Sequence, residues 1–192
     1  MKRITFPLLL LSFFWISCSS NEQTSGQTES DEPITFFPVH RFFQGELYEI
    51  KSKGIGPLYK TSIRGKTDSV WLRHEQLDSA FADFLQPAID SATLSPYFKE
   101  TSFLDATINA FTLDSEPRNT TIPDSIPWKK WSVYIDPVSQ KVKRVYLTKR
   151  AGEEKEWQLT WNAGRSCKIL LINKATGAAE PIERETTITW DF

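Results

Sequence analysis

Apolar residues recur at helical spacing in two segments of the first half of the chain, residues 38–53 and 74–87. The first segment starts with Pro38, and proline suits the first turn of a helix. Its apolar face consists of Val39, Phe42, Phe43, Leu47 and Ile50. The apolar face of the second segment consists of Leu77, Phe81, Phe84 and Leu85. The pattern therefore predicts two amphipathic helices, and Pro87 predicts the end of the second one.

Apolar and polar residues alternate with a period of two in several other segments, which is typical of strands with one buried face. Residues 58–63 and 69–73 flank the polar turn 64–68 and predict a hairpin. Residues 103–111 predict one strand that carries Ala106 and Ile108 on the same face. Further strands are predicted at residues 131–136, 141–149, 157–161, 167–172 and 186–192. We therefore expect an α+β fold, an antiparallel β-meander of about five to seven strands with two helices packed on one face.

Tryptophans recur at alternating positions of the predicted strands, at Trp131, Trp157, Trp161 and Trp190. Aromatic walls suit hydrophobic ligands, so these rings could line an apolar pocket for a lipid or a peptide. The same pattern also fits a packed core between a sheet and its helices. The sequence leaves both interpretations open.

The N-terminal residues have the build of a secretory signal. Lys2 and Arg3 precede an apolar run that extends from Ile4 to Ile16, and a small serine and Cys18 follow. This run is shorter than the roughly 20 residues that a membrane-spanning helix needs. The order of charge, apolar run and cysteine resembles the lipobox signal of bacterial lipoproteins. An ordinary signal peptide, cut elsewhere and with an unmodified Cys18, is the alternative.

The resemblance implies that residues 1–17 are removed and that Cys18 receives a diacylglycerol and further acyl chains such as palmitate. Its partner is then the lipid bilayer. Residues 18–33 contain no aromatic or aliphatic side chain after the cysteine, which predicts a disordered tether. Residues 34–192 remain as a single globular α+β domain. Segments such as LYKTSIRGKTDS, VKRVYL and LTWNAGRSCKI are similar to uncharacterised small lipoproteins of Bacteroidota. This resemblance implies no catalytic residue.

The charge of the chain argues against nucleic-acid binding, and its cysteine content argues against an internal disulfide. The formal net charge is −1, and the densest basic run, residues 143–150, alternates with apolar residues as an exposed strand would. Nucleic acid is therefore not an expected partner, because its recognition needs clustered Lys and Arg. If Cys18 carries lipid, Cys167 has no partner for an internal disulfide. We expect Cys167 to be a small buried strand residue.

No catalytic, metal or cofactor motif is present in the sequence. The two histidines, His40 and His74, lack the spacing of a metal site, and HExxH fails after His74. The glycines around Gly54 and Gly65 match neither a dinucleotide-binding loop nor a phosphate-binding loop, and no GxSxG occurs. We therefore expect no catalytic residue, no metal and no cofactor. On these motifs alone, a protein that is not an enzyme is the simplest interpretation.

One short motif recurs. Asp-Ser followed by an apolar residue is similar to the O-glycosylation site of exported Bacteroidota proteins. The acceptors would be Ser69, Ser79, Ser91 and Ser125. Asp and Ser are also common in helix caps and turns, which is the alternative explanation of the motif.

Three functions fit these observations. The leading one is a membrane-anchored envelope lipoprotein that acts as a non-enzymatic binding or scaffold module, with a lipid or a peptide as possible ligand. The second is an envelope glycan or peptide hydrolase with unidentified carboxylates, and the third is a docking subunit of an outer-membrane complex. Only Glu22 is acidic directly after the cysteine, which favours an outer-membrane lipoprotein that faces the periplasm.

Overall fold

The computed structural model describes residues 36–175 and 181–190. The predicted signal peptide, Cys18 and the predicted tether lie outside these residues. Pro33–Phe192 form one compact unit. Among the residues described, no helix is long and apolar enough to cross a membrane.

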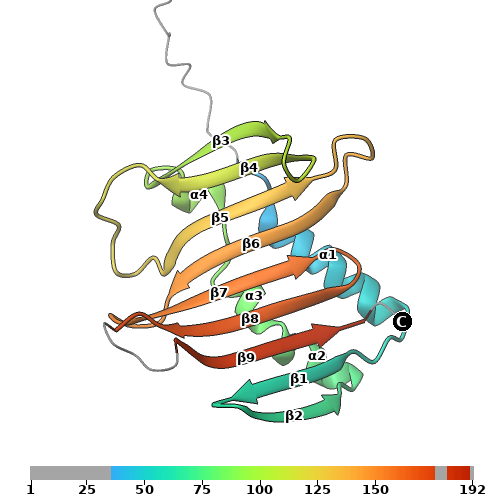
Figure 1. Ribbon diagram of the computed structural model, residues 1–192. Coiled ribbons are helices and arrows are strands. Elements are labelled where there is room, and N and C mark those ends of the chain that lie inside the picture. Colours follow the sequence, from blue (N-terminus) through green and yellow to red (C-terminus); the bar gives the residue numbers. More distant parts are fainter. Residues whose placement is uncertain (1–35, 176–180, 191–192) are drawn as a thin grey trace, which may run out of the picture. The chain divides into compact units, whose positions relative to one another are not determined.

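One antiparallel sheet of nine strands makes up most of the domain (Figure 1). Its order is β2-β1-β9-β8-β7-β6-β5-β4-β3. The strands are β1 Leu58–Ile63, β2 Lys66–Trp71, β3 Phe98–Asp105, β4 Ala110–Pro117, β5 Trp128–Ile135, β6 Val142–Arg150, β7 Lys155–Asn162, β8 Ser166–Asn173 and β9 Ile182–Thr189. Strands β3 to β9 follow one another as a meander, and the hairpin of β1 and β2 joins the sheet beside β9.

Helices lie on one face of this sheet (Figure 1). The long helix α1 spans Val39–Ser52. The shorter segments are η1 His74–Gln76, α2 Leu77–Ala80, α3 Ala82–Leu85 and α4 Ser91–Leu94. Asp90 caps α4, because its carboxylate accepts a hydrogen bond from the Thr93 N–H at 3.2 Å. The fold is therefore mainly β, with helices restricted to one side.

The core fills the space between the sheet and the helices. Phe43, Phe81 and Phe84 come from the helical side and surround Trp161 of β7, with ring centroids 5.0–5.2 Å from it. Trp161 is fully buried and Trp190 is 5% exposed. A second aromatic group holds Trp131 of β5 against Phe36 and Phe98. Burial of aromatic rings on this scale supplies much of the stability of a domain that has no disulfide among its described residues.

The helix at residues 38–53 and the strands of the second half are confirmed, with shifts of a few residues at their ends. The prediction of a single helix over 74–87 is wrong, because the chain leaves helical geometry at Phe81. Leu77, Phe81 and Phe84 nevertheless share the buried side as predicted. The predicted count of five to seven strands is too low, because the sheet has nine.

The prediction of one strand over residues 103–111 is also wrong. These residues belong to two strands, β3 and β4, and Ala106 and Ile108 lie in the turn between them. The Asp105 carboxylate accepts hydrogen bonds from the Thr107 N–H and hydroxyl, and Asn109 has a φ of 46°. An Asp turn followed by a residue in the left-handed region reverses the chain, and it outweighs the alternation of apolar residues. The β1–β2 turn is likewise shorter than predicted, with positive φ at Arg64 and Gly65.

Candidate functional site

The face of the sheet opposite the helices, here called the open face, carries a polar row of side chains from edge to edge. One row of register partners crosses all nine strands. The row consists of Ser69, Lys60, Thr187, Lys168, Thr160, Tyr146, Ser132, Asp114 and Thr101. No described helix covers this face (Figure 1). Such a row offers donors and acceptors to a polar partner.

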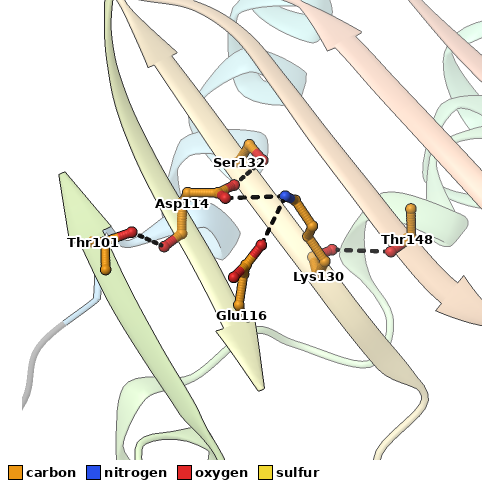
Figure 2. A network of polar contacts seen from close by, with 6 residues as sticks. All are labelled: Thr101, Asp114, Glu116, Lys130, Ser132 and Thr148. Carbon is orange, nitrogen blue, oxygen red and sulfur yellow. Dashed lines mark hydrogen bonds and ion pairs between the residues drawn. The ribbon is translucent and has the colours of Figure 1, made fainter. Parts of the chain in front are cut away.

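A network of polar contacts lies on the open face over β4 and β5 (Figure 2). The Lys130 ammonium donates to Asp114 at 3.0 Å and to Glu116 at 3.1 Å. Ser132 is 2% exposed, and its hydroxyl donates to the other oxygen of Asp114. The Asp114 side chain is 16% exposed. These contacts fix Asp114 from two sides, so the network is a rigid part of the surface.

The two strands that flank β4 and β5 extend this network, because a threonine hydroxyl on each donates to one of its backbone carbonyls (Figure 2). The Thr101 hydroxyl of β3 donates to the backbone carbonyl of Asp114 at 3.4 Å, and the Thr148 hydroxyl of β6 donates to that of Lys130 at 3.5 Å. Burial acts to lower the pKa of Lys130, but the bonds from its ammonium to Asp114 and Glu116 raise that pKa above its usual value. Lys130 therefore stays charged and pairs with both carboxylates beside it.

A second charged cluster centres on Glu156 of β7, which is 4% exposed. One oxygen accepts hydrogen bonds from the Lys129 and Lys174 ammonium groups, both at 2.6 Å. The other oxygen accepts from the Gln158 amide at 3.4 Å. Burial acts to raise the pKa of Glu156, but these bonds hold it below its usual value. The carboxylate is thus a structural anion for two lysines.

Two tyrosines lie on the open face near these clusters, Tyr134 on β5 and Tyr146 on β6. The Arg144 guanidinium lies 4.8 Å from the ring centroid of Tyr134, which is a cation–π distance. Burial and the negative charge of Glu156 raise the pKa of Tyr146 above its usual value. The Tyr146 phenol therefore stays neutral and can donate or accept hydrogen bonds at the surface.

The predicted tryptophan wall lies on the other face of the sheet. Trp131 and Trp161 are fully buried among phenylalanine rings, so they fill the core rather than face a ligand. The Trp161 indole N–H donates to Glu46 of α1 at 3.1 Å. Cys167 of β8 is also fully buried, as predicted, and burial raises the pKa of its thiol well above the usual value. A thiol of this kind is inert.

The predicted glycosylation acceptors are scattered over the domain. Ser69 on β2, Ser79 on α2 and Ser125 in the loop before β5 are exposed. Ser91 at the start of α4 is half-buried, and its hydroxyl oxygen accepts the Phe36 N–H at 2.9 Å. The first three can be reached by an enzyme, whereas Ser91 already has a structural contact.

The two histidines also lie apart from each other. His40 of α1 borders a surface hollow of about 570 Å³ beside Asp90 and Ser91, whereas His74 opens η1. Across the described parts of the chain, no group of three or more His, Cys, Asp or Glu side chains could hold a metal ion.

The sequence analysis missed the residues of both charged clusters. Asp114 and Glu116 went unassigned because the strand that carries them was misplaced. The signal was present in the alternation itself, since Asp114 and Glu116 are two residues apart, as are Lys130 and Ser132. Comparison with protein-family models, with curated proteins and with solved structures gives no match to this chain.

Proposed function

We propose that this chain is a lipid-anchored lipoprotein of the bacterial cell envelope whose domain is a non-enzymatic binding or scaffold module. Cys18 carries the anchor, and the domain holds a hydrophilic partner protein of the envelope on its open face. The observation that supports this proposal is the polar row of side chains that crosses every strand without a covering helix. A docking subunit of an outer-membrane complex is one form of the same function.

The chemistry of the described residues favours a module that binds a polar partner over a lipid carrier or a hydrolase. The buried tryptophans are packed by phenylalanine rings, which argues against a tryptophan-lined carrier for a lipid. Asp114, Glu116 and Glu156 are all held by lysines. Burial raises the pKa of Glu100, but its carboxylate already accepts two hydrogen bonds within the domain. General acid catalysis needs a carboxyl that keeps its proton near neutral pH. A hydrolase would need such a group beside a second free carboxylate.

Site-specific photo-crosslinking in cells that produce the protein tests the binding surface. A benzophenone amino acid at Lys168 or Thr187, both on the open face, should yield one discrete adduct. The matched control is the same probe at Gln44 or Glu49, which are exposed on α1. Adducts of equal yield from both faces, or none from the open face, would contradict this proposal.

The anchor needs a separate test, because a protein can also reach a membrane by surface contact. The mature protein should remain in the membrane fraction after washes with high salt and alkaline carbonate, since two or more acyl chains give firm anchoring. Cys18→Ala should abolish this resistant fraction, while Cys167→Ala serves as the matched cysteine control. Retention of Cys18→Ala after both washes would disprove the anchor.

We propose O-glycosylation only at the exposed acceptors Ser69, Ser79 and Ser125. The intact mass of the mature protein should then exceed that of peptide plus lipid by whole sugar residues, and alanine at these serines should remove the excess. A mass equal to peptide plus lipid would exclude this modification.

A further inference from the structure

Three turns meet at one end of the sheet, at the right in Figure 1. They are residues 106–109 between β3 and β4, residues 136–141 between β5 and β6, and residues 163–165 between β7 and β8. These turns, together with the strand residues next to them, are called the turn end below. The Lys143 ammonium, at the start of β6 just after the second turn, donates to the backbone carbonyl of Asn109 in the first turn at 3.5 Å.

The turn end carries large apolar side chains that face solvent. Leu104 is 63% exposed and Val138 is 89% exposed. Phe103, Ile108 and Phe111 are 47%, 38% and 38% exposed. Leu104 and Phe111 are register partners, and Phe111 is in turn paired with Ile135 before the second turn. Neighbouring exposed apolar side chains on two adjacent turns mark a contact surface rather than scattered surface residues.

Basic side chains surround these apolar residues. Lys141, Lys143, Arg144 and Arg165 are all exposed, and they come from the second and third turns and the adjoining part of β6. The acidic residues within these turns and the strand ends beside them are Asp105 and Asp136. Their carboxylates accept hydrogen bonds within their own turns, Asp105 from Thr107 and Asp136 from Ser139. Both carboxylates stay charged, and Glu46 of α1 adds a third beside the last turn, where it accepts the Gly164 N–H at 2.8 Å. The four basic side chains still outnumber these three carboxylates.

We propose that the turn end binds the surface of an anionic bilayer. Aromatic and aliphatic tips fit the boundary between headgroups and acyl chains, and Lys and Arg beside them pair with anionic headgroups. The inference rests on the proposed membrane location, which it deepens by naming the surface that touches the lipid.

The path of the chain agrees with this occupant. The Phe37 N–H donates to Glu100 of β3 at 3.3 Å, so the chain reaches the domain beside the strand that leads into the turn end. From Cys18 to Phe36 the chain can span at most about 60 Å at ~3.3–3.6 Å per residue. A cysteine anchored in the bilayer therefore keeps the turn end within reach of the lipid surface.

Vesicle binding by a chain that starts at Ser19 tests the proposal without the anchor. This chain keeps the compact unit Pro33–Phe192 and its entire core. It should sediment with vesicles of phosphatidylethanolamine and phosphatidylglycerol, and much less with vesicles of phosphatidylcholine alone. Added salt should release it. The charge reversals Lys141→Glu and Arg165→Glu together should weaken binding about tenfold or more, because each basic residue near an anionic surface contributes to affinity.

Matched controls separate this surface from general stickiness. Leu104→Ser with Val138→Ser should weaken binding, whereas Ile63→Ser with Ile182→Ser, at the opposite end of the sheet, should not. Lys60→Glu with Lys66→Glu is the matched control for charge. Equal losses from both ends, or equal binding to neutral and anionic vesicles, would overturn the proposal.

A labelled variant shows which part of the domain touches the lipid. An environment-sensitive dye on Val138→Cys should shift to shorter wavelength on anionic vesicles, and the same dye on Ile63→Cys should not. Cys167 is fully buried and does not compete for the label. If the dye shows no shift while the full-length protein still resists the washes in cells, the turn-end contact alone is refuted. If the vesicles are bound but the full-length protein is washed from the membrane, the lipidation of Cys18 is refuted.

Discussion

Glu100 and Glu156 each follow a lysine in the sequence, but their surroundings shift the pKa of the two carboxyls in opposite directions. Glu100 accepts hydrogen bonds from the Phe37 N–H and the Ser115 hydroxyl, both neutral donors, and burial raises its pKa. Glu156 is held by two ammonium groups, which keep its pKa below the usual value despite burial. The two residues should therefore contribute to stability with opposite dependence on pH.

Glu100→Gln should raise the stability of the domain at neutral pH. The raised pKa means that the folded state binds a proton more tightly than the unfolded state, so the charge of Glu100 destabilises the fold above its folded pKa. An amide oxygen can accept the same hydrogen bonds without this cost. We expect Tm at pH 7 to rise by up to about 2 °C, and the difference to vanish below the unfolded pKa of about 4.3. An unchanged or lower Tm at pH 7 would contradict this account.

Glu156→Gln should lower stability, because Lys129 and Lys174 lose the charge that they share. Because the folded pKa is lowered, this contribution to stability is present at pH values above the unfolded pKa of about 4.3. It is lost as the pH falls through the folded pKa. We expect a loss of about 1–2 kcal/mol at pH 7, measured by urea denaturation, and a smaller loss at acid pH. A loss that does not depend on pH would indicate packing rather than charge.

At the scale of elements, Glu46 joins α1 to the sheet. One of its oxygens accepts the Trp161 indole N–H of β7 at 3.1 Å and the Gly164 N–H of the following turn at 2.8 Å. Lys149 makes the corresponding link from β6, since its ammonium donates to the Asp83 carboxylate of α3 at 2.8 Å. Helices and sheet are therefore held by directed polar contacts as well as by aromatic packing.

Glu46→Ala should destabilise the domain by about 1–3 kcal/mol, or several degrees in Tm, because the buried Trp161 N–H would lose its acceptor. Glu46→Gln keeps an acceptor oxygen and should cost much less. The near-ultraviolet circular dichroism of the buried indole offers a second measurement. Equal losses in both variants would show that the charge of Glu46, and not its hydrogen bond, is what matters.

Local periodicity predicted the elements whose burial follows one face, such as α1 and strands β5 to β8. It failed where a few polar contacts decide the backbone. At residues 103–111 the Asp105 turn reverses a chain that alternates like a strand. At Phe81 packing against Trp161 and Trp190 divides a helix whose apolar pattern is continuous. The Glu156 cluster could not be predicted either, because Glu156 and its lysines Lys129 and Lys174 meet only when strands pair.

At the scale of the whole molecule, an open sheet has two edges that could pair with another chain. These edges are β2 and β3. Every residue of β2 is exposed, and Lys66 and Asp68 point to the same side of the sheet as the helices. Inward-facing charges on an edge strand oppose pairing with a second sheet, since the pairing would bury them. These two residues therefore protect the edge while the open face and the turn end remain free to bind.

Lys66→Thr together with Asp68→Val should turn this edge into a pairing site. Both substitutions favour strand structure and remove the charges that pairing would bury. We expect association that increases with protein concentration, measured by light scattering after size-exclusion chromatography, whereas Thr67→Val on the opposite side of the same strand should change association little. If the double variant stays at the apparent mass of the parent protein, the charges do not protect the edge, and the shortness of β2 is the stronger barrier to pairing.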